Sequence, residues 1–514
     1  MPTIDHQADR HVVIDKRKGH YVCFPDVLCT ASGRLIAVYR EADQHVAGRC
    51  AILHKISGDL GRTWSEARYL NPSSGHCPRI SRLRGGEIVV IDDMTNTIFF
   101  GDDSLQAFTP QAYAGAHIPL ADRVLELPDG AFFTTGHTHR GNFPHPKTRQ
   151  PTSEQMGYQS DNRGKDFYPL SIVAFDPCLV LCEASVTRLP DGRLLALMRE
   201  NSFVYEPMYY CLSSDNGRTW SRPAPTPLIG HRPTVGLTRA GKLLVTYRNV
   251  GPDPGTAAWL GDLEELTGDF AVHGRTPSPD NPKLTDEGLV IENKSGRLDL
   301  ARYALRPLTD PEEARAVLTC EVKVDRAGRH GCGVLFGGWW RLFPDRIEPP
   351  GPLGVAGPVP LRRGRFHDLR FVFNKGAVTL FVDGEKKTRI RADAKNADAR
   401  PIVFGTKSFT EKNHGRHIWR KVTLAIDEPR YARKYRWSWD YRDGLPDAYA
   451  KARVLELKNA RFCTSGDFGY SGWTELPDGR FFCAFHHNEG GQRSYRSGFN
   501  SYVMGSWFSA EDFG

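Results

Sequence analysis

The chain has 514 residues, with 68 Lys and Arg against 60 Asp and Glu, so its formal net charge is +8. No apolar run approaches the roughly 18 residues that cross a bilayer, and residues 1–15 lack the apolar segment of a secretory signal. We therefore expect no membrane span and a cytoplasmic protein, or a secreted or periplasmic one if a signal has been removed. Eleven cysteines without CxxC pairs disfavour a disulfide framework and a zinc site.

One sequence pattern recurs along the chain: an apolar run, a tight turn that ends in glycine, and a second apolar run that closes on a polar residue. Each copy predicts a β-hairpin, because glycine supplies the positive φ that such turns need. The six turn glycines are Gly33, Gly86, Gly130, Gly192, Gly241 and Gly479. The first five follow one another at 44 to 62 residues, a spacing typical of four-stranded blades. The pattern predicts an all-β fold, a six-bladed β-propeller.

A second motif, S-x-D-x-G-x-T-W, occurs at residues 57–64 and 213–220, with a degenerate copy at 160–167. Its Asp can accept turn N–H groups and its Trp can pack under the loop, so we interpret the motif as structural. These octapeptides resemble the Asp boxes of the sialidase (neuraminidase, BNR-repeat) superfamily. The resemblance covers residues 20–275 and 460–514 and implies a six-bladed propeller.

The last two turn glycines are 238 residues apart, which leaves room for an inserted domain. Its alternating apolar and polar residues predict an antiparallel β-sandwich. The segment resembles concanavalin-like (laminin-G type) jelly rolls. We expect blades 1–5 in residues 1–279, the sandwich in 280–452, and blade 6 with ring closure in 453–514.

The predicted sandwich carries the positive charge, because residues 281–450 hold 32 Lys and Arg against 22 Asp and Glu. Its aromatic residues suit either sugar stacking or core packing; they are Trp339, Trp340, Trp437 and Trp439. The segment therefore has two interpretations: a carbohydrate-binding domain, or a structural domain through which the chain forms a homo-oligomer.

The repeat also predicts which residues face the propeller axis. Nine residues before the turn glycines lie Phe24, Cys77, Ala121, Glu183, Arg232 and Tyr470. Seven residues after them lie Arg40, Asp93, His137, Arg199, Arg248 and His486. Cationic side chains gathered at a narrow axis repel one another, so this set favours an anionic ligand or internal carboxylates.

The sialidase resemblance implies roles for these positions. Tyr470, in a Gly-Tyr-Ser segment, matches the nucleophile, and Glu183 matches its base; Arg199 and Arg232 match arginines that bind the substrate carboxylate. A neutral Tyr avoids the repulsion that a carboxylate nucleophile would meet at an acidic sugar. In the loop after the first hairpin, the resemblance implies Asp43 as the general acid.

Two features leave the assignment open. His45 lies two residues after Asp43 and is its rival as the acid. Where sialidases carry the first arginine, this chain has Cys23-Phe24-Pro25, and the following Asp26 would oppose a carboxylate. Either Arg40 or Arg248 replaces that arginine, or the substrate is another acidic sugar or a neutral one.

Three functions remain after these observations. The first is a sialidase-like exo-glycosidase with a glycan substrate. The second is a propeller polysaccharide lyase acting on uronates, with acid–base candidates among Tyr470, His76, His137, His139 and His231. The third is a non-catalytic carbohydrate-binding protein. No nucleotide-binding glycine motif, metal-ligand spacing or basic stripe is present, so we expect no cofactor, no metal and no nucleic-acid partner.

Overall fold

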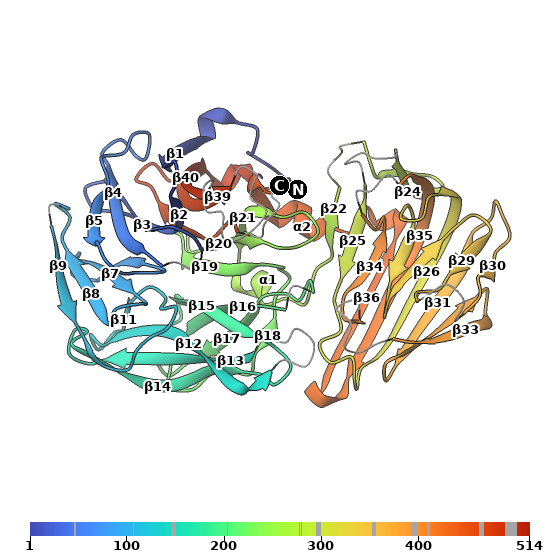
Figure 1. Cartoon of the computed structure of the whole chain (residues 1–514), viewed down its shortest axis with the longest axis horizontal. Coiled ribbons are helices and arrows are strands. Elements are labelled where there is room, and N and C mark those ends of the chain that lie inside the picture. The colour runs from blue at the N-terminus through green and yellow to red at the C-terminus, as the bar shows by residue number, and fades with distance from the viewer. Residues whose placement is uncertain are drawn as a thin grey trace.

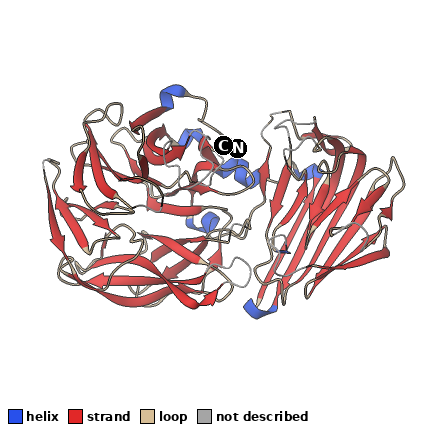
Figure 2. Ribbon diagram, viewed as in Figure 1, coloured by secondary structure: helices blue, strands red, loops and turns tan. Residues whose placement is uncertain are grey.

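A computed structural model describes residues 1–514 except 46–47, 106, 145–150, 203, 277, 279, 295–299, 352–355, 393–398, 409–411, 462–466 and 489–500. Strands dominate the described chain, and its helices are short (Figure 2). The two α-helices are α1 (Leu263–Leu266) and α2 (Ala448–Arg453). No helix among the described residues is long and apolar enough to span a membrane.

Six sheets form the ring of a β-propeller, which confirms that part of the predicted fold (Figure 1). The first blade contains β2 (Tyr21–Cys29), β3 (Leu35–Ala42), β4 (Cys50–Ser57) and β5 (Arg68–Asn71), and the second contains β6 (Arg79–Arg82), β7 (Ile88–Asp92), β8 (Thr97–Gly101) and β9 (Phe108–Ala112). The third contains β11 (Leu125–Glu126), β12 (Phe132–Pro144), β13 (Pro151–Ser160) and β14 (Asp166–Phe175), with β10 (Ala114–Gly115) parallel to β14.

The remaining blades bring together strands that are distant in the sequence. The fourth blade contains β15 (Leu181–Arg188), β16 (Leu194–Glu200), β17 (Tyr209–Ser213) and β18 (Ala224–Pro225). The fifth contains β19 (His231–Leu237), β20 (Leu243–Asn249), β21 (Gly255–Gly261) and β37 (Val454–Asn459). The sixth contains β38 (Ser471–Glu475), β39 (Phe481–Asn488), β40 (Ser501–Phe508) and β1 (His11–Asp15). Because β1 pairs with β40, the N-terminal segment closes the ring, and the two termini lie close together in Figure 1.

The hairpin turns have the backbone geometry that the repeat predicts. The six turn glycines have φ between +78° and +90°, where a side chain is strained. In the first S-x-D-x-G-x-T-W octapeptide, Asp59 accepts the N–H and hydroxyl of Thr63 at 2.9 and 2.6 Å, and the Trp64 indole donates to the Gly61 carbonyl at 2.9 Å. The copy at Asp215 forms the same bonds. These carboxylates bind their own loops, as a structural motif requires.

The chain leaves the propeller within the fifth blade. We expected residues 453–514 to form the sixth blade and the ring closure, but β37 within this range pairs with β21 and is the outer strand of the fifth blade. The strand β22 (His273–Arg275) already pairs with β25 of a further sheet, so this sheet begins before the expected boundary at 280. The segment that returns to the propeller thus pairs first with the outer edge of β21, which would otherwise lack a partner strand.

The intervening segment forms two large antiparallel sheets, in yellow and orange in Figure 1. We call them the two-sheet unit. One contains β22, β25 (Arg302–Leu305), β34 (Ile402–Gly405), β27 (Gly333–Leu335), β28 (Trp339–Leu342), β29 (Arg346–Glu348) and β30 (Val359–Pro360). The other contains β23 (Lys283–Thr285), β24 (Gly288–Asn293), β35 (Gly415–Glu428), β26 (Arg315–Ala327), β31 (His367–Asn374), β32 (Ala377–Val382) and β33 (Glu385–Arg391), with β36 (Arg433–Asp440) on β35.

The two sheets share one hydrophobic core. Trp340, Trp419 and Trp439 are buried in it, and Trp437 packs against its side. Core packing thus accounts for most of the aromatic residues considered above. A jelly-roll topology for this unit stays a prediction.

Candidate functional site

Three of the inner propeller strands contain a β-bulge at the position that the repeat places near the axis. Register shifts fall between Cys23 and Asp26 and at the corresponding points of β15 and β19. The bulged residues Phe24, Glu183 and Arg232 have φ of 52°, 51° and 48°, a conformation that costs on the order of 1–3 kcal/mol for a residue with a side chain. Bulges re-aim side chains, and here the affected side chains belong to one cluster.

Tyr470, Glu183 and Arg199 form the centre of this cluster. The Tyr470 hydroxyl donates to Glu183 Oε1 at 2.8 Å, and Arg199 Nη1 donates to Glu183 Oε2 at 2.7 Å. The same Nη1 also donates to the Tyr470 oxygen. Residues 287 positions apart in the chain are therefore joined in one hydrogen-bonded group, as the equivalent strand positions predict.

Arg248 and Arg232 lie beside this group, and Arg40 lies beside His45. The Arg248 guanidinium lies 4.9 Å from the centre of the Tyr470 ring, and its Nη2 lies 2.7 Å from His231 Nδ1. Arg40 donates to the His45 carbonyl at 3.0 Å. Arg232 is 2% exposed, and its two Nη atoms have no hydrogen-bond partner among the described residues. Buried, unsatisfied donors on a cation fit an anionic ligand.

These cations set the charge of Glu183. Burial by itself would raise the pKa of this carboxyl, but Arg199, Arg232 and Arg248 outweigh it and lower the pKa to about 2. Burial, together with the Glu183 charge, raises the pKa of the Tyr470 hydroxyl. Near neutral pH the pair therefore consists of a neutral Tyr and an ionised Glu, which is the arrangement needed for proton transfer from Tyr to Glu.

Histidines paired with carboxylates lie beside the cluster. His45 Nδ1 is 3.3 Å from Asp467 Oδ2, and His486 Nε2 is 3.2 Å from the other oxygen of Asp467. His76 Nδ1 lies 2.9 Å from Asp93 Oδ2.

The Phe24 ring connects these groups to the nucleophile candidate. Its centre is 5.7 Å from the ring of His45, 5.1 Å from that of His76 and 5.2 Å from that of Tyr470. Phe24 thus occupies the middle of the site, next to the position where the resemblance places an arginine. Cys23 is fully buried in the same cluster of apolar side chains.

Asp26 and Asp43 bind partners outside the Tyr470 group, and His137 lies on the third blade. Asp26 is fully buried, and its carboxylate binds Arg123, Arg79 and the Ile80 N–H, so it joins inner strands of the propeller. Asp43 is exposed and accepts the Gly48 N–H of its own loop at 3.1 Å. His137 is buried on β12, and its backbone N–H donates to the Pro119 carbonyl at 3.1 Å. The side chain of His139 lies outside the described residues.

Sequence reasoning missed the carboxylates that hold the histidines. Asp93 occupies an axis-facing position in the repeat, and that position was the available signal. Asp467 has no equivalent in the other blades, so no periodicity points to it. Burial would raise the pKa of Asp467, but its bonds to His45 and His486 hold it far below the usual range, so it remains an anion.

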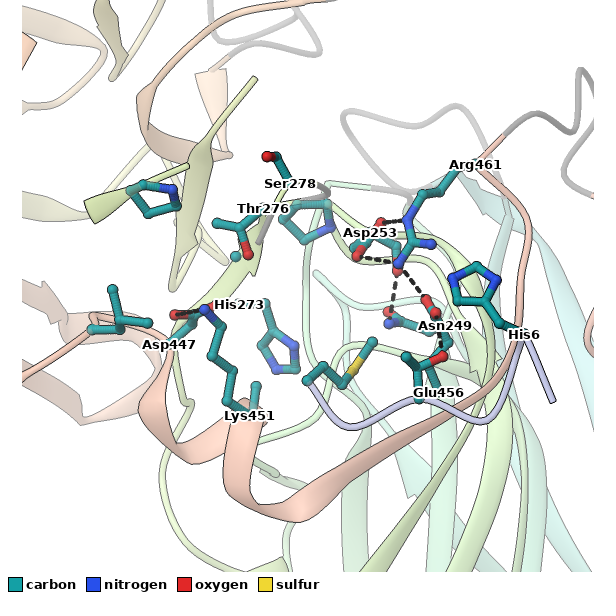
Figure 3. A pocket seen from close by; sticks show the side chains of 17 residues that line it. His6, Asn249, Asp253, His273, Thr276, Ser278, Asp447, Lys451, Glu456 and Arg461 are labelled. Carbon is teal, nitrogen blue, oxygen red and sulfur yellow. Dashed lines mark hydrogen bonds and ion pairs between the residues drawn. The ribbon is translucent and has the colours of Figure 1, made fainter. Parts of the chain in front are cut away.

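The cavity in Figure 3 lies elsewhere, where the fifth blade meets the two-sheet unit. Its volume is about 440 Å³. The charged groups in it neutralise one another: Arg461 pairs with Asp253 at 2.7 Å and with Glu456 at 2.6 Å, and Lys451 is 3.6 Å from Asp447 (Figure 3). This balance leaves no charge for an acidic ligand, so we place the candidate site at Tyr470.

No protein-family model matches the chain, and no curated protein sequence matches it. Solved structures do match. A protein of unknown function from Dyadobacter fermentans is 12% identical, with 97% of each chain covered and a TM-score of 0.46. The GH43 BlXynB protein from Bacillus licheniformis is 11% identical, with 79% of this chain and 86% of that chain covered and a TM-score of 0.39.

Trypanosoma rangeli sialidase is 11% identical, with 79% of this chain and 91% of that chain covered and a TM-score of 0.34. All three TM-scores are below 0.5, so the fold is assigned from the strand pairing and the site from its own geometry.

Proposed function

We propose that the chain is a sialidase-like, exo-acting glycoside hydrolase that removes a terminal acidic sugar. The observation that carries the proposal is the hydrogen-bonded group of Tyr470, Glu183 and Arg199 beside the unsatisfied guanidinium of Arg232. A Tyr bonded directly to an ionised carboxylate is an activated nucleophile. Arginine donors beside it suit the carboxylate of an acidic sugar.

In the first step, Tyr470 Oη attacks the anomeric carbon while its proton passes to Glu183 across the 2.8 Å hydrogen bond. The bond from the anomeric carbon to the leaving oxygen breaks, and that oxygen takes a proton from a general acid. Arg199, which donates to the Tyr470 oxygen, stabilises the negative charge that develops there.

In the second step, water attacks the anomeric carbon and gives a proton to the deprotonated acid. Tyr470 leaves and recovers its proton from Glu183. Two displacements at one carbon return the original configuration, so the proposal predicts a retaining enzyme.

We assign the general acid to His45 rather than Asp43. His45 Nδ1 lies 3.3 Å from Asp467 Oδ2 and 2.9 Å from the Tyr21 hydroxyl, and these two groups orient the ring. The His45 ring also contacts Phe24, which contacts Tyr470. Asp43 is exposed and holds its own loop, which places it poorly for a leaving group at Tyr470.

Arg232 and Arg248 are assigned to the substrate carboxylate, with Arg40 at the edge of the site. Arg248 lies over the Tyr470 ring, in position to replace the arginine that is missing at Cys23. Arg40 is buried and contacts Phe24, with its guanidinium 5.7 Å from the ring centre. The two Nη atoms of the buried Arg232 have no hydrogen-bond partner among the described residues, which favours an acidic substrate over a neutral one.

The deciding experiment measures release of monosaccharide from a panel of chromogenic sialosides and uronides. On the substrate that is cleaved, Tyr470→Phe is expected to lower kcat more than about 10³-fold while binding persists. Tyr113→Phe is the matched control, because Tyr113 is also buried and belongs to a hydrophobic cluster of the second and third blades that does not include Tyr470. Full activity in Tyr470→Phe would remove the assigned nucleophile.

A lyase acting on uronates is the second candidate, and the two carboxylate-paired histidines favour it. In that reaction a base takes the proton next to the sugar carboxylate, the β carbon–oxygen bond breaks, the leaving oxygen is protonated and a C=C bond forms. The unsaturated product absorbs ultraviolet light, whereas hydrolysis gives a saturated sugar. Absorbance that rises with product release would therefore select the lyase.

A further inference from the structure

A second cavity of about 370 Å³ lies on the two-sheet unit, a volume in the usual range of small-molecule sites. It forms where the end of β33 meets β28 and the loops around β27. All its lining residues belong to the two-sheet unit: Arg329, His330, Gly337, Gly338, Trp339, Arg341, Pro350, Gly351, Ile390, Arg391 and Lys407. It is thus a site separate from Tyr470.

The charged side chains that line this cavity are all positive. Four cationic side chains line it and no carboxylate does. Arg341 pairs with Glu348 at 3.2 Å, but Arg329, Arg391 and Lys407 have no ion pair with a described residue. Burial lowers the pKa of His330, and the positive charges of Lys407 and Arg329 lower it further. The cavity therefore attracts an anion.

Trp339 adds a donor to the cations. It is 7% exposed, and its indole Nε1 is buried without a hydrogen-bond partner among the described residues. By contrast, the indole of Trp340 donates to the Phe336 carbonyl at 3.1 Å and that of Trp439 to the Gly444 carbonyl at 2.9 Å. A buried indole N–H usually finds an acceptor, so Trp339 is the one of these three that suits a ligand oxygen.

Two glycines allow the walls of the cavity to pack closely. A Cβ on Gly333 would come within 2.6 Å of the Trp339 ring, and a Cβ on Gly338 within 2.7 Å of Pro350. Lys407 Nζ lies 5.8 Å from the centre of the Trp339 ring. The indole, which is 7% exposed, is thus held by close packing against the Gly333 backbone.

We propose that this cavity binds an acidic saccharide unit, with its carboxylate or sulfate held by Arg329, Arg391 and Lys407 and a ring oxygen or hydroxyl accepting the Trp339 N–H. The two-sheet unit would then hold an acidic glycan independently of the reaction at Tyr470. Binding and turnover are therefore separable properties of the chain.

Isothermal titration of the intact chain tests the proposal, in the Tyr470→Phe background so that no probe is consumed. The probes are a hyaluronan hexasaccharide, which carries carboxylates, a chondroitin sulfate hexasaccharide, which also carries sulfates, a neutral chitin hexasaccharide and sodium sulfate. We expect at least one acidic hexasaccharide to bind at least about tenfold more tightly than the neutral one, and the stronger acidic probe identifies the preferred anion.

Three variants locate the binding. Arg391→Ala/Lys407→Ala is expected to weaken it at least about tenfold, because charge-assisted hydrogen bonds are lost. Trp339→Phe, which keeps a smaller aromatic ring and loses the N–H, is expected to weaken it less. Lys386→Ala/Lys434→Ala removes the same charge from exposed positions outside the cavity and is expected to change little.

Four results would overturn the proposal. The first two are that no acidic probe binds, and that sodium sulfate binds as tightly as the hexasaccharides. The other two are that the Lys386/Lys434 control weakens binding as much as the cavity variant, and that binding is lost only in a propeller variant, Arg232→Met. The last result would place the ligand in the propeller. Cavity binding without any hydrolysis by the parent chain would support this proposal and overturn the proposed function, so the two fail separately.

Discussion

Replacing Arg199 by Met tests the electrostatics on which the proposed reaction depends. Arg199 Nη1 lies 2.7 Å from Glu183 Oε2. With about 4 Å between charge centres and an effective dielectric constant of about 20, the pair is worth about 4 kcal/mol. At about 1.4 kcal/mol per unit, the loss raises the pKa of Glu183 by about three units. Starting from about 2, the pKa in the variant should lie near 5.

The sign of the effect follows from the role of Glu183. It accepts the Tyr470 proton only when ionised, so activity is lost as the pH falls through its pKa. We expect the acidic limb of kcat to move into the region of pH 5 in Arg199→Met, together with a lower maximal kcat, because the phenolate also loses a donor. The assay is kcat against pH from 4 to 9, with circular dichroism at each pH to confirm that the variant is folded.

Arg400→Met is the control for general destabilisation. Arg400 donates to Glu206 at 2.8 Å, and both side chains are 1% exposed, so removing one partner of this buried pair also costs stability. The Arg400–Glu206 pair joins the two-sheet unit to the fourth blade and does not contact Tyr470. The acidic limb of the curve of kcat against pH should therefore stay unchanged in Arg400→Met. An unmoved limb in Arg199→Met, or an equal shift in Arg400→Met, would refute the reasoning.

Other expected outcomes concern stability and the acid. Asp59→Ala removes the bonds from Thr63 and should lower the free energy of unfolding in urea by about 1–2 kcal/mol while the folded protein keeps its kcat; a loss of kcat would contradict a structural motif. Gly241→Ala places a side chain at φ +78° with open space around it, so urea unfolding should show a cost of about 1 kcal/mol from the backbone alone; no cost would contradict the turn geometry. His45→Gln should lower kcat about 10²-fold or more on a sugar leaving group and little on a nitrophenol, which needs no acid; equal losses on both would argue against the assigned acid.

Much of the propeller was predictable because its determinants are local and repeated. A glycine at φ near +80° is required at each hairpin turn, and six such glycines mark six blades. Every blade presents equivalent strand positions to one axis. The spacing from the turn glycines therefore also predicted that Glu183 and Tyr470 lie near each other, and in the structure they are hydrogen bonded. Position within the repeat was therefore enough to bring distant residues together.

Features that depend on non-local contacts were not predictable in this way. The assignment of β37 to the fifth blade follows from the open edge of β21, which is a property of the assembled sheet. Asp43 and His45 are two residues apart and equally plausible as acids from their spacing. They differ in the structure because Asp467, more than 400 positions away along the chain, lies against His45 and not against Asp43.

The sequence by itself thus determined the all-β repeat, the number of blades and the residue types near the axis, since these follow from turn geometry and periodicity. The excess of cations in residues 281–450 was also visible in it. Only the tertiary structure decided how that charge is distributed, by bringing Arg329, Arg391 and Lys407 to the lining of one cavity together with Trp339. Burial and ion pairing decide which charges are neutralised, and both arise only when separate segments meet.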